Sequence, residues 1–412
     1  MMKILHTSDW HLDARLYNQR RSAEHEAFLE WLRQTIREQQ VQLLVVAGDI
    51  FDNRTPTLES QERYVAFLMG LYEDSIRGKS VCRNVVLIGG NHDSASFLEI
   101  PKPILQHLRI HVVARKPARW DDLVLEMKDD AGKTEAVVAA LPFLSDVDLR
   151  RSVEGETLEE KNRHLMEGIR DAYKTLAEIA TTKRSAISTE AFVPLIATGH
   201  LFTQGGDAGD GVREIYTAGN LEKFPAAWIP ERFDYTALGH LHLPQTVGGR
   251  ENVRYSGSPI PVGFQEAKTA KQVVLVTWEG DGKRSIELRD VPRFQRLETV
   301  SGDWPELEAS LKTLKKMDEP VWLQVRYTGK AFRPMLQRDV EELLEDSSVV
   351  LLHLQSTAAS DRGLVPNFSG ETLESLEPLE VFRRVLDACK IPDEERDEYI
   401  QTYREVWESC GF

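Results

Sequence analysis

Five short apolar runs in this sequence each end abruptly in a polar cluster, and this repeated pattern constrains the fold more than any other feature. The runs are four to seven residues long and rich in Val, Ile and Leu: Met2–His6, Val41–Ala47, Asn84–Ile88, Val193–Thr198 and Tyr235–Leu238. Such runs predict buried strands rather than helices. Apolar residues at three- and four-residue steps predict helices near 27–36 and 64–72. The chain is therefore expected to begin β-α-β-α-β, as a layered α/β domain.

The rest of the chain predicts two further parts. Strands are expected at Val253–Tyr255, Val273–Trp278 and Ser285–Val291, completing a first domain over residues 1–290. A small α+β domain over residues 291–357 is predicted from alternating patterns at Leu297–Val300, Trp304–Lys315, Val321–Tyr327, Arg338–Glu345 and Val349–Leu354. Residues 358–412 predict a linker and two amphipathic helices. Their apolar stripes suit a partner protein, although packing on their own domain stays an alternative.

Composition narrows the classes of function. The 412 residues include 51 Lys and Arg against 66 Asp and Glu, a net charge of −15, which argues against DNA binding through basic patches. No apolar run approaches the ~18 residues of a membrane span, and the first residues do not resemble a secretory signal. Three distant cysteines, Cys82, Cys389 and Cys410, predict neither a disulfide framework nor a thiolate zinc site, and they fit a reducing cytoplasm. The sequence also lacks a Walker-type nucleotide motif.

The polar clusters predict one site, because the loops that follow parallel strands converge on one edge of a sheet. Their nitrogen and oxygen donors are Asp9, His11, Asp49, Asn91, His200, His240 and His242. One such histidine at a strand end is usually only a satisfied polar residue, but five clusters in order are not expected by chance. Seven donors suit two ions about 3.5–4 Å apart that share a carboxylate. Imidazole, carboxylate and amide without thiolate favour Mn²⁺-like or Fe-like ions over structural zinc.

The local spacing supports a shared centre. Asp-x-His and His-x-His place both side chains on one side of an extended chain. The glycines before Asp49, His200 and His240 are expected to let the backbone turn sharply at the strand ends. His92, next to Asn91, should point elsewhere and serve as a proton donor or phosphate contact. The carboxylate of Asp52 is expected to orient His92 by accepting its ring N–H.

The remaining histidines lack such context and are expected to be structural: His6, His25, His107, His111, His164 and His353. Trp10 and Phe51 sit inside the polar clusters, but core packing is expected for both rather than stacking on bases.

The polar clusters, taken in order, resemble the signature of the calcineurin-like metallophosphoesterases. The motifs are Asp9-x-His11, Gly48-Asp49-x-x-Asp52, Gly89-Gly90-Asn91-His92-Asp93, Gly199-His200 and Gly239-His240-x-His242. Four segments are similar to the SbcD family, the nuclease subunits of bacterial SbcCD complexes. They are Ile4-Leu5-His6-Thr7-Ser8-Asp9-Trp10-His11-Leu12, Ala197-Thr198-Gly199-His200, Tyr255-Ser256-Gly257-Ser258-Pro259-Ile260-Pro261 and Leu376-Glu377-Pro378-Leu379-Glu380-Val381-Phe382. The resemblance spans nearly the whole chain and is weakest over residues 120–190 and 295–360.

The resemblance implies a four-layer α/β/β/α sandwich with a capping domain that lies over DNA. It implies one metal held by Asp9, His11, Asp49 and His242, and a second held by Asp49, Asn91, His200 and His240. Asp49 would bridge the two ions, and His92 would stabilise the transition state or protonate the leaving oxygen. Asp52 stands where archaeal and eukaryotic relatives carry His, which fits the bacterial branch and leaves its role open.

The resemblance also implies an activity and partners. The activity would be an Mn²⁺-dependent double-strand exonuclease and single-strand or hairpin endonuclease in DNA repair and recombination. It would depend on ATP through SbcC, an SMC-like ATPase whose coiled-coil base receives the C-terminal helices. Two copies of each subunit, a homodimer of this chain and a cytoplasmic, nucleoid-associated location are expected. A small-molecule phosphodiesterase, a protein phosphatase and a non-catalytic scaffold that regulates an ATPase remain alternatives.

Overall fold

The fold was obtained as a computed structural model, which describes most of the chain. It describes residues 1–149, 157–187, 191–204, 206, 223–330, 333 and 335–356, together with residues 379, 382, 383, 386, 396 and 399–404. The chain divides into two compact units, Met1–Phe294 and Gln295–Phe412. Each unit is described by itself.

The first unit contains two six-stranded sheets. The first sheet has the order β14 (Arg284–Asp290), β13 (Gln272–Trp278), β1 (Met2–Thr7), β4 (Leu43–Ala47), β5 (Asn84–Ile88) and β6 (Ile110–Val113). The second has the order β11 (Gln245–Val247), β12 (Arg250–Tyr255), β10 (Tyr235–Gly239), β9 (Leu195–His200), β8 (Thr134–Ala139) and β7 (Val124–Lys128). Strands β1, β4, β5 and β6 run parallel, as do β8, β9, β10 and β12. All five strands expected from the apolar runs are therefore present.

The two faces of the first sheet bury different cores, since successive side chains of a strand point to opposite faces. All five residues of β4 are buried. Val45 packs in the core that lies between the two sheets. Leu44 and Val46 pack with Phe28 of α1 (Ser22–Glu38) and Leu68 of α2 (Leu58–Ile76). Continuous apolar runs are the sequence mark of strands covered on both sides.

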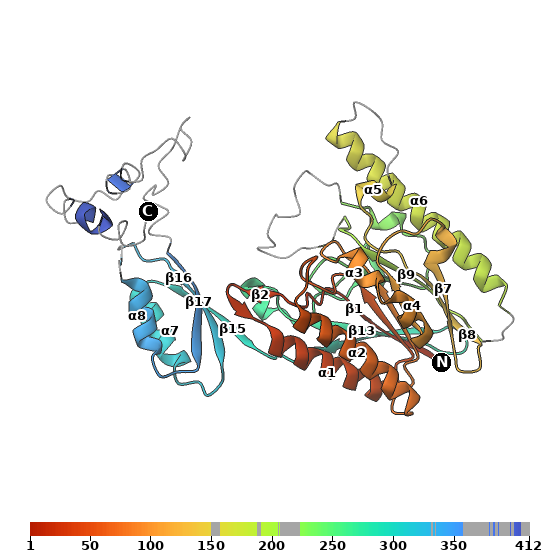
Figure 1. The fold of residues 1–412 in the computed structure, drawn as a ribbon, viewed down its shortest axis with the longest axis horizontal. Helices are drawn as coiled ribbons and strands as arrows, with labels where there is room; N and C mark the ends of the chain where they lie inside the picture. Colours follow the sequence, from red (N-terminus) through yellow and green to blue (C-terminus); the bar gives the residue numbers. More distant parts are fainter. Residues whose placement is uncertain are drawn as a thin grey trace. The chain divides into compact units, whose positions relative to one another are not determined.

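A single long helix, α6 (Leu158–Ser185), packs on the second sheet through residues such as Tyr173 and Leu176. Figure 1 shows α1 and α2 side by side in red and orange, with α6 in yellow-green at the other flank of this unit. The layers are therefore helix, sheet, sheet and helix, and the expected four-layer sandwich is confirmed.

Several elements between residues 90 and 190 have no counterpart in the sequence prediction. They are β6, β7, β8, α6 and the short helices α3 (Ala95–Glu99), α4 (Lys102–Leu105) and α5 (Asp146–Leu149). The buried stripe of α6 includes Ala172, Ala177 and Ala180. The larger apolar residues of the same face, Met166, Ile169, Tyr173 and Leu176, recur at three- and four-residue steps, so the sequence carries a helical period that the prediction missed. Thr157 and Glu160 close its N-terminus with a capping box.

The second unit has the β-α-β-α-β order expected from the sequence. Its elements are β15 (Arg296–Gly302), α7 (Trp304–Leu314), β16 (Val321–Tyr327), α8 (Leu336–Leu344) and β17 (Val349–Ser356). The strands are parallel in the order β15-β16-β17. Leu307 and Leu311 of α7 and Val340 of α8 pack on β16 and give this unit its own core.

The two helices expected after residue 370 lie largely outside the described residues. Phe382 and Tyr403 are described as helical, and their rings stack with centroids 4.3 Å apart. Among the helices that the structure describes, none is long and apolar enough to cross a membrane.

Candidate metal centre

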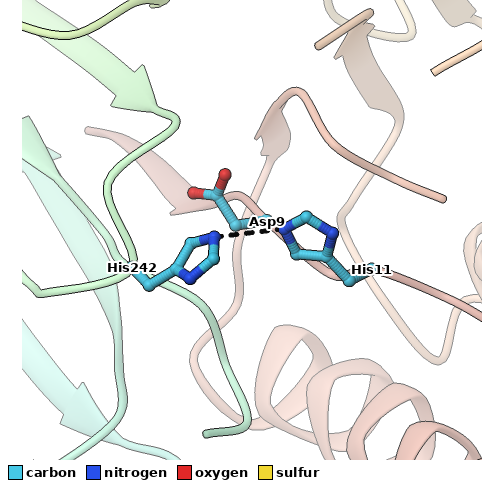
Figure 2. A group of neighbouring side chains, drawn as sticks. All are labelled: Asp9, His11 and His242. Carbon is cyan, nitrogen blue, oxygen red and sulfur yellow. Dashed lines mark hydrogen bonds between the residues drawn. The ribbon is translucent and has the colours of Figure 1, made fainter. Parts of the chain in front are cut away.

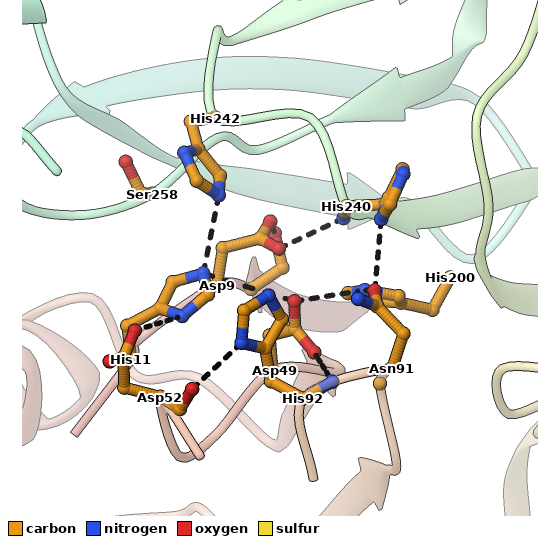
Figure 3. A network of polar contacts seen from close by, with 12 residues as sticks. Asp9, His11, Asp49, Asp52, Asn91, His92, His200, His240, His242 and Ser258 are labelled. Carbon is orange, nitrogen blue, oxygen red and sulfur yellow. Dashed lines mark hydrogen bonds and ion pairs between the residues drawn. The ribbon is translucent and has the colours of Figure 1, made fainter. Parts of the chain in front are cut away.

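The parallel strands of both sheets end at one common site. Asp9 and His11 follow β1, Asp49 follows β4 and Asn91 follows β5, while His200 ends β9 and His240 and His242 follow β10. Figure 3 shows these seven side chains pointing toward one another, with His92 and Asp52 beside them. The structure therefore brings together all nine site residues expected from the sequence, and it draws them from both sheets.

One cluster consists of Asp9, His11 and His242 (Figure 2). One donor atom from each lies within 4.8 Å of the others. The Nε2 atoms of His11 and His242 are 3.2 Å apart. Because two ring nitrogens with lone pairs repel at this distance unless a cation or proton lies between them, the arrangement suits a bound cation.

The second cluster is built around Asn91. Its Oδ1 lies 2.9 Å from Nε2 of His200 and 3.0 Å from Nδ1 of His240. The same Nε2 of His200 lies 3.2 Å from Oδ2 of Asp49. A divalent ion with bonds of about 2.1 Å at right angles sets neighbouring donors about 3 Å apart. The donor set and its spacing therefore fit a divalent ion.

The carboxylate of Asp49 lies between the two clusters. Its Oδ2 faces His200 at 3.2 Å and Nε2 of His11 at 3.8 Å. Its Oδ1 accepts a hydrogen bond from the backbone N–H of His92 at 2.9 Å. The residue is only 2% exposed, so water does not compete for these oxygens. One carboxylate is thus within reach of donors on both sides.

Four of the converging residues have a left-handed backbone. The φ angles are 53° at Asp9, 46° at His11, 50° at Asp49 and 99° at His240. This region is sparsely populated by residues with a Cβ, and each such residue costs on the order of 1–3 kcal/mol. Strain of this kind collects at functional sites, where the geometry of a side chain matters more than stability.

The glycines at the strand ends serve two different purposes, which corrects the sequence interpretation. Gly48 does turn the chain, with φ at 89°. Gly199 and Gly239 do not have a positive φ. A Cβ on Gly239 would lie 2.0 Å from the carbonyl oxygen of Ala47, and one on Gly199 would lie 2.0 Å from the hydroxyl of Tyr173. These two glycines are needed because neighbouring layers approach closely.

The carboxylates give the site a field that favours cations. Burial by itself would lower the pKa of His11, but Asp52, Asp49 and Asp9 outweigh it and raise that pKa to about 9. Burial also opposes charge on His200, yet Asp49 and Asp9 raise its pKa to about 9. Metal ligands must be deprotonated, so a metal ion that binds here displaces protons from these imidazoles.

Asp52 lies against His92, but through a different atom from the one expected. Nδ1 of His92 is 2.7 Å from the backbone carbonyl oxygen of Asp52, which accepts its proton. The Asp52 carboxylate instead lies 3.2 Å from Nδ1 of His11. The side chain of Asp52 therefore acts on His11, and its backbone orients His92. Sequence spacing identifies the neighbouring residue but cannot say which of its oxygens faces the ring.

The sequence prediction missed two residues at the site, Asp93 and Glu266. Asp93 is buried and accepts hydrogen bonds from the backbone N–H groups of Ile50, Phe51 and Gly90. It thereby ties the loop after β4 to the loop after β5. Oε1 of Glu266 lies 3.3 Å from Nδ1 of His242. The position of Asp93 within the Asn-His-Asp motif was a signal in the sequence, whereas Glu266 stands outside every motif.

Comparison with known families agrees with this fold. Residues 2–244 match the family model of the calcineurin-like phosphoesterases. Residues 293–390 match the model described as the type 5 capsule protein repressor C-terminal domain, SbcD_C. The packed sheets and the donor clusters at their edge therefore define a metallophosphoesterase.

Relatives that match two thirds of the chain or more narrow the class of protein. The chain is 36% identical to the D subunit of nuclease SbcCD from Escherichia coli K12 over 97% of this chain and 96% of the relative. It is 36% identical to the protein of the same name from Rhodobacter capsulatus, over 77% of each chain. A third relative of that name, from Bacillus subtilis, is 34% identical over 67% of this chain and 66% of the relative. The chain belongs to the SbcD family of calcineurin-like phosphoesterases.

Proposed function

We propose that this chain is a two-metal nuclease subunit that hydrolyses DNA phosphodiesters. The observation that carries the proposal is the pair of donor clusters sharing Asp49 at one edge of both sheets. Asn91, His92, His240 and His242 are half-buried at this edge, so a substrate has access to the site. The proposal draws further support from the nuclease names of relatives that match 97% and 77% of this chain.

The proposed ligands divide into two sets with one shared member. Asp9, His11, Asp49 and His242 would hold one ion, and Asp49, Asn91, His200 and His240 the other. Mn²⁺ suits this set of imidazole, carboxylate and amide donors without thiolate. When bound, two such ions supply charge neutralisation at the phosphodiester and activation of water.

His92 is proposed as the proton donor to the leaving oxygen. The carbonyl of Asp52 accepts the Nδ1 proton of His92, so the proton for the leaving oxygen would come from Nε2 of a ring protonated on both nitrogens. The ring of His92 also lies edge-on to His11, with centroids 4.9 Å apart, so it stands beside the proposed metal ligands. The Asp52 carboxylate supports His11, and we assign it that role rather than a direct one in catalysis.

The domains are proposed to share the work as a nuclease domain over residues 1–290, a DNA-capping domain over 291–357 and a partner-binding tail over 358–412. Residues 361–412 carry 6 Lys and Arg against 13 Asp and Glu, a net charge of −7, which suits a protein partner better than DNA. The −15 of the whole chain also fits weak DNA binding by the metal-free chain alone. Affinity for DNA would then come from the ions, the cap and the partner.

The partner proposed is SbcC, an SMC-like ATPase, because the relatives are named for one component of a two-part nuclease, SbcCD. ATP dependence would come from that second component. A complex of two copies each is supported by an exposed apolar stripe on α2, which could pair two copies of this chain. Its residues recur at steps of seven and four and are Leu58, Val65, Met69 and Ile76. Because DNA is the proposed substrate, we also propose a cytoplasmic location at the nucleoid.

The proposal is tested by incubating the chain with Mn²⁺ and an end-labelled DNA duplex or hairpin, with and without purified SbcC and ATP. Cleavage that EDTA stops and Mn²⁺ restores is expected. Hydrolysis of a small phosphodiester or a phosphopeptide with intact DNA would indicate another metallophosphoesterase. A change in the ATPase rate of SbcC without any hydrolysis would indicate a scaffold. Either of these results would contradict the nuclease proposal.

A further inference from the structure

The second ring nitrogen of His242 faces a carboxylate that no sequence motif contains. Nε2 of His242 points to His11, whereas Nδ1 lies 3.3 Å from Oε1 of Glu266. Glu266 belongs to the 3₁₀ segment η5 (Phe264–Lys268) and its side chain is 15% exposed. The contact is therefore shielded from bulk water.

Glu266 is itself held by three donors. Its Oε2 accepts from Nζ of Lys271 at 2.5 Å, from the backbone N–H of Val262 at 3.1 Å and from the hydroxyl of Ser258 at 3.4 Å. Nζ of Lys271 also donates to Oγ of Ser258 at 2.9 Å and to the backbone carbonyl of His242 at 3.1 Å. Figure 3 shows Ser258 beside His242. Both oxygens of the Glu266 carboxylate thus have partners, Oε1 with His242 and Oε2 with the three donors. Lys271 also contacts the backbone of His242.

This arrangement has a physical consequence for the ring. A neutral imidazole that offers Nε2 to a cation carries its proton on Nδ1, and that proton needs an acceptor. His200 uses the carbonyl oxygen of Ala47 for this purpose, at 2.8 Å, and His11 faces the Asp52 carboxylate. A carboxylate acceptor fixes the tautomer and makes the ligating nitrogen more basic than a carbonyl does. Both imidazoles of the Asp9 cluster are therefore backed by a carboxylate.

Glu266 does not itself serve as a ligand. Its Oε1 faces Nδ1, the ring nitrogen opposite the one that meets His11. The ammonium of Lys271 is 5% exposed and bonded to the other carboxylate oxygen, where it would repel a second cation. Among the described residues, the groups of carboxylates and imidazoles close enough to hold an ion do not include Glu266.

We propose that Glu266 is a positioning residue that holds His242 in the Nδ1–H tautomer, and that Lys271 holds Glu266 in place and balances its charge. The inference rests on the proposed function in one respect, that His242 is a metal ligand. Neither Glu266 nor Lys271 belongs to the proposed ligand set, and the inference gives this pair a role in holding one of the ligands.

Binding of Mn²⁺ to the full chain tests this inference without any substrate. Glu266→Gln keeps the size of the side chain and removes its charge. The variant is expected to lower the affinity for one of the two Mn²⁺ ions by about 10–100-fold in titration calorimetry. The affinity for the other ion should stay unchanged. Electron paramagnetic resonance should then show an isolated Mn²⁺ at a concentration that gives the coupled pair in the wild type. Glu287→Gln, which removes the same charge from an exposed ion pair with Arg289 on β14, is the matched control.

The outcomes separate the inference from the proposed function. Glu266→Gln with wild-type affinity for both ions overturns the inference and leaves the proposed function standing. A wild-type chain that binds fewer than two ions overturns the ligand set instead. Glu266→Asp keeps the charge and should recover part of the affinity, which a purely structural role does not predict.

Should both variants fail to fold, a crystal structure of the Mn²⁺-loaded wild type provides the test. It is expected to show the metal on Nε2 of His242 and Glu266 at Nδ1. Metal on Nδ1, or on Glu266 itself, overturns the inference.

Discussion

Replacing Gly239 with alanine is expected to damage both stability and the metal centre. The new Cβ would lie 2.0 Å from the carbonyl oxygen of Ala47 and 2.9 Å from Nδ1 of His200. Real Cβ atoms essentially never come within 3.0 Å of another heavy atom, so β10 must move away from β4 by about 1 Å. The clash is with backbone, which has no other rotamer to adopt.

The magnitude follows from two contributions. Overpacking of a buried site costs about 1–3 kcal/mol. The same carbonyl of Ala47 accepts the hydrogen bond from His200, and its loss adds about 1 kcal/mol. The free energy of unfolding should therefore fall by about 2–4 kcal/mol. A displacement of about 1 Å at His200 and His240 should also lower cleavage about 100-fold.

Urea unfolding in EDTA, followed by tryptophan fluorescence, measures the stability, and calorimetric titration with Mn²⁺ measures the site. Gly280→Ala is the control, because no heavy atom lies within 4 Å of the Cβ position at Gly280. That variant should stay within about 0.5 kcal/mol of wild type. If Gly239→Ala were as stable as Gly280→Ala and bound Mn²⁺ normally, the close approach of the two sheets would be refuted as the reason for the glycine.

Four further changes test other parts of the molecule. His92→Gln should lower cleavage by about 10²–10⁴-fold while Mn²⁺ titration stays unchanged, and cleavage at the wild-type rate would disprove a catalytic role. Asp49→Ala should lower the affinity for both metal ions. Elemental analysis that still finds two metals per chain would rule out Asp49 as the ligand that bridges them. The two arginines that pair with Asp74 outweigh burial and hold its pKa below the usual range, so its stabilising contribution is present at neutral pH and disappears as pH falls through that lowered pKa. Asp74→Asn should therefore lower the free energy of unfolding by about 2 kcal/mol at pH 7 and by progressively less below about pH 4. A difference between variant and wild type in urea unfolding that does not change with pH would contradict this. Leu58→Glu should weaken any homodimer at least about tenfold in light scattering, and an unaltered dimer would exclude the stripe on α2 as its interface.

The fold and the donors could be read from the sequence because both depend on local patterns. A buried parallel strand such as β4 is a continuous apolar run, and its polar neighbour Asp49 must then stand at the edge of the sheet. The second unit was equally readable, since Leu307 and Leu311 recur at the helical period. Helix α6 was missed, although Ile169, Tyr173 and Leu176 on its buried face recur at the same period.

The finer structure of the site could not be read in this way. Whether Asp52 faces His92 through its carboxylate or its carbonyl depends on how two loops lie across each other. The need for glycine at position 239 comes from Ala47, a residue in the other sheet. Nothing in the chain near Glu266 indicates that it meets His242, 24 residues away.

The sequence by itself determined that polar donors stand at the ends of five strands, because strand patterns and the edges they create are encoded residue by residue. Only the tertiary structure decided which atoms meet at the centre. It placed Asp49 between two clusters and set a carboxylate behind both His11 and His242. The physical reason is that these contacts join loops far apart in the sequence. The contact between Asp49 and His200 also crosses from one sheet to the other, so its distance depends on how closely the sheets pack.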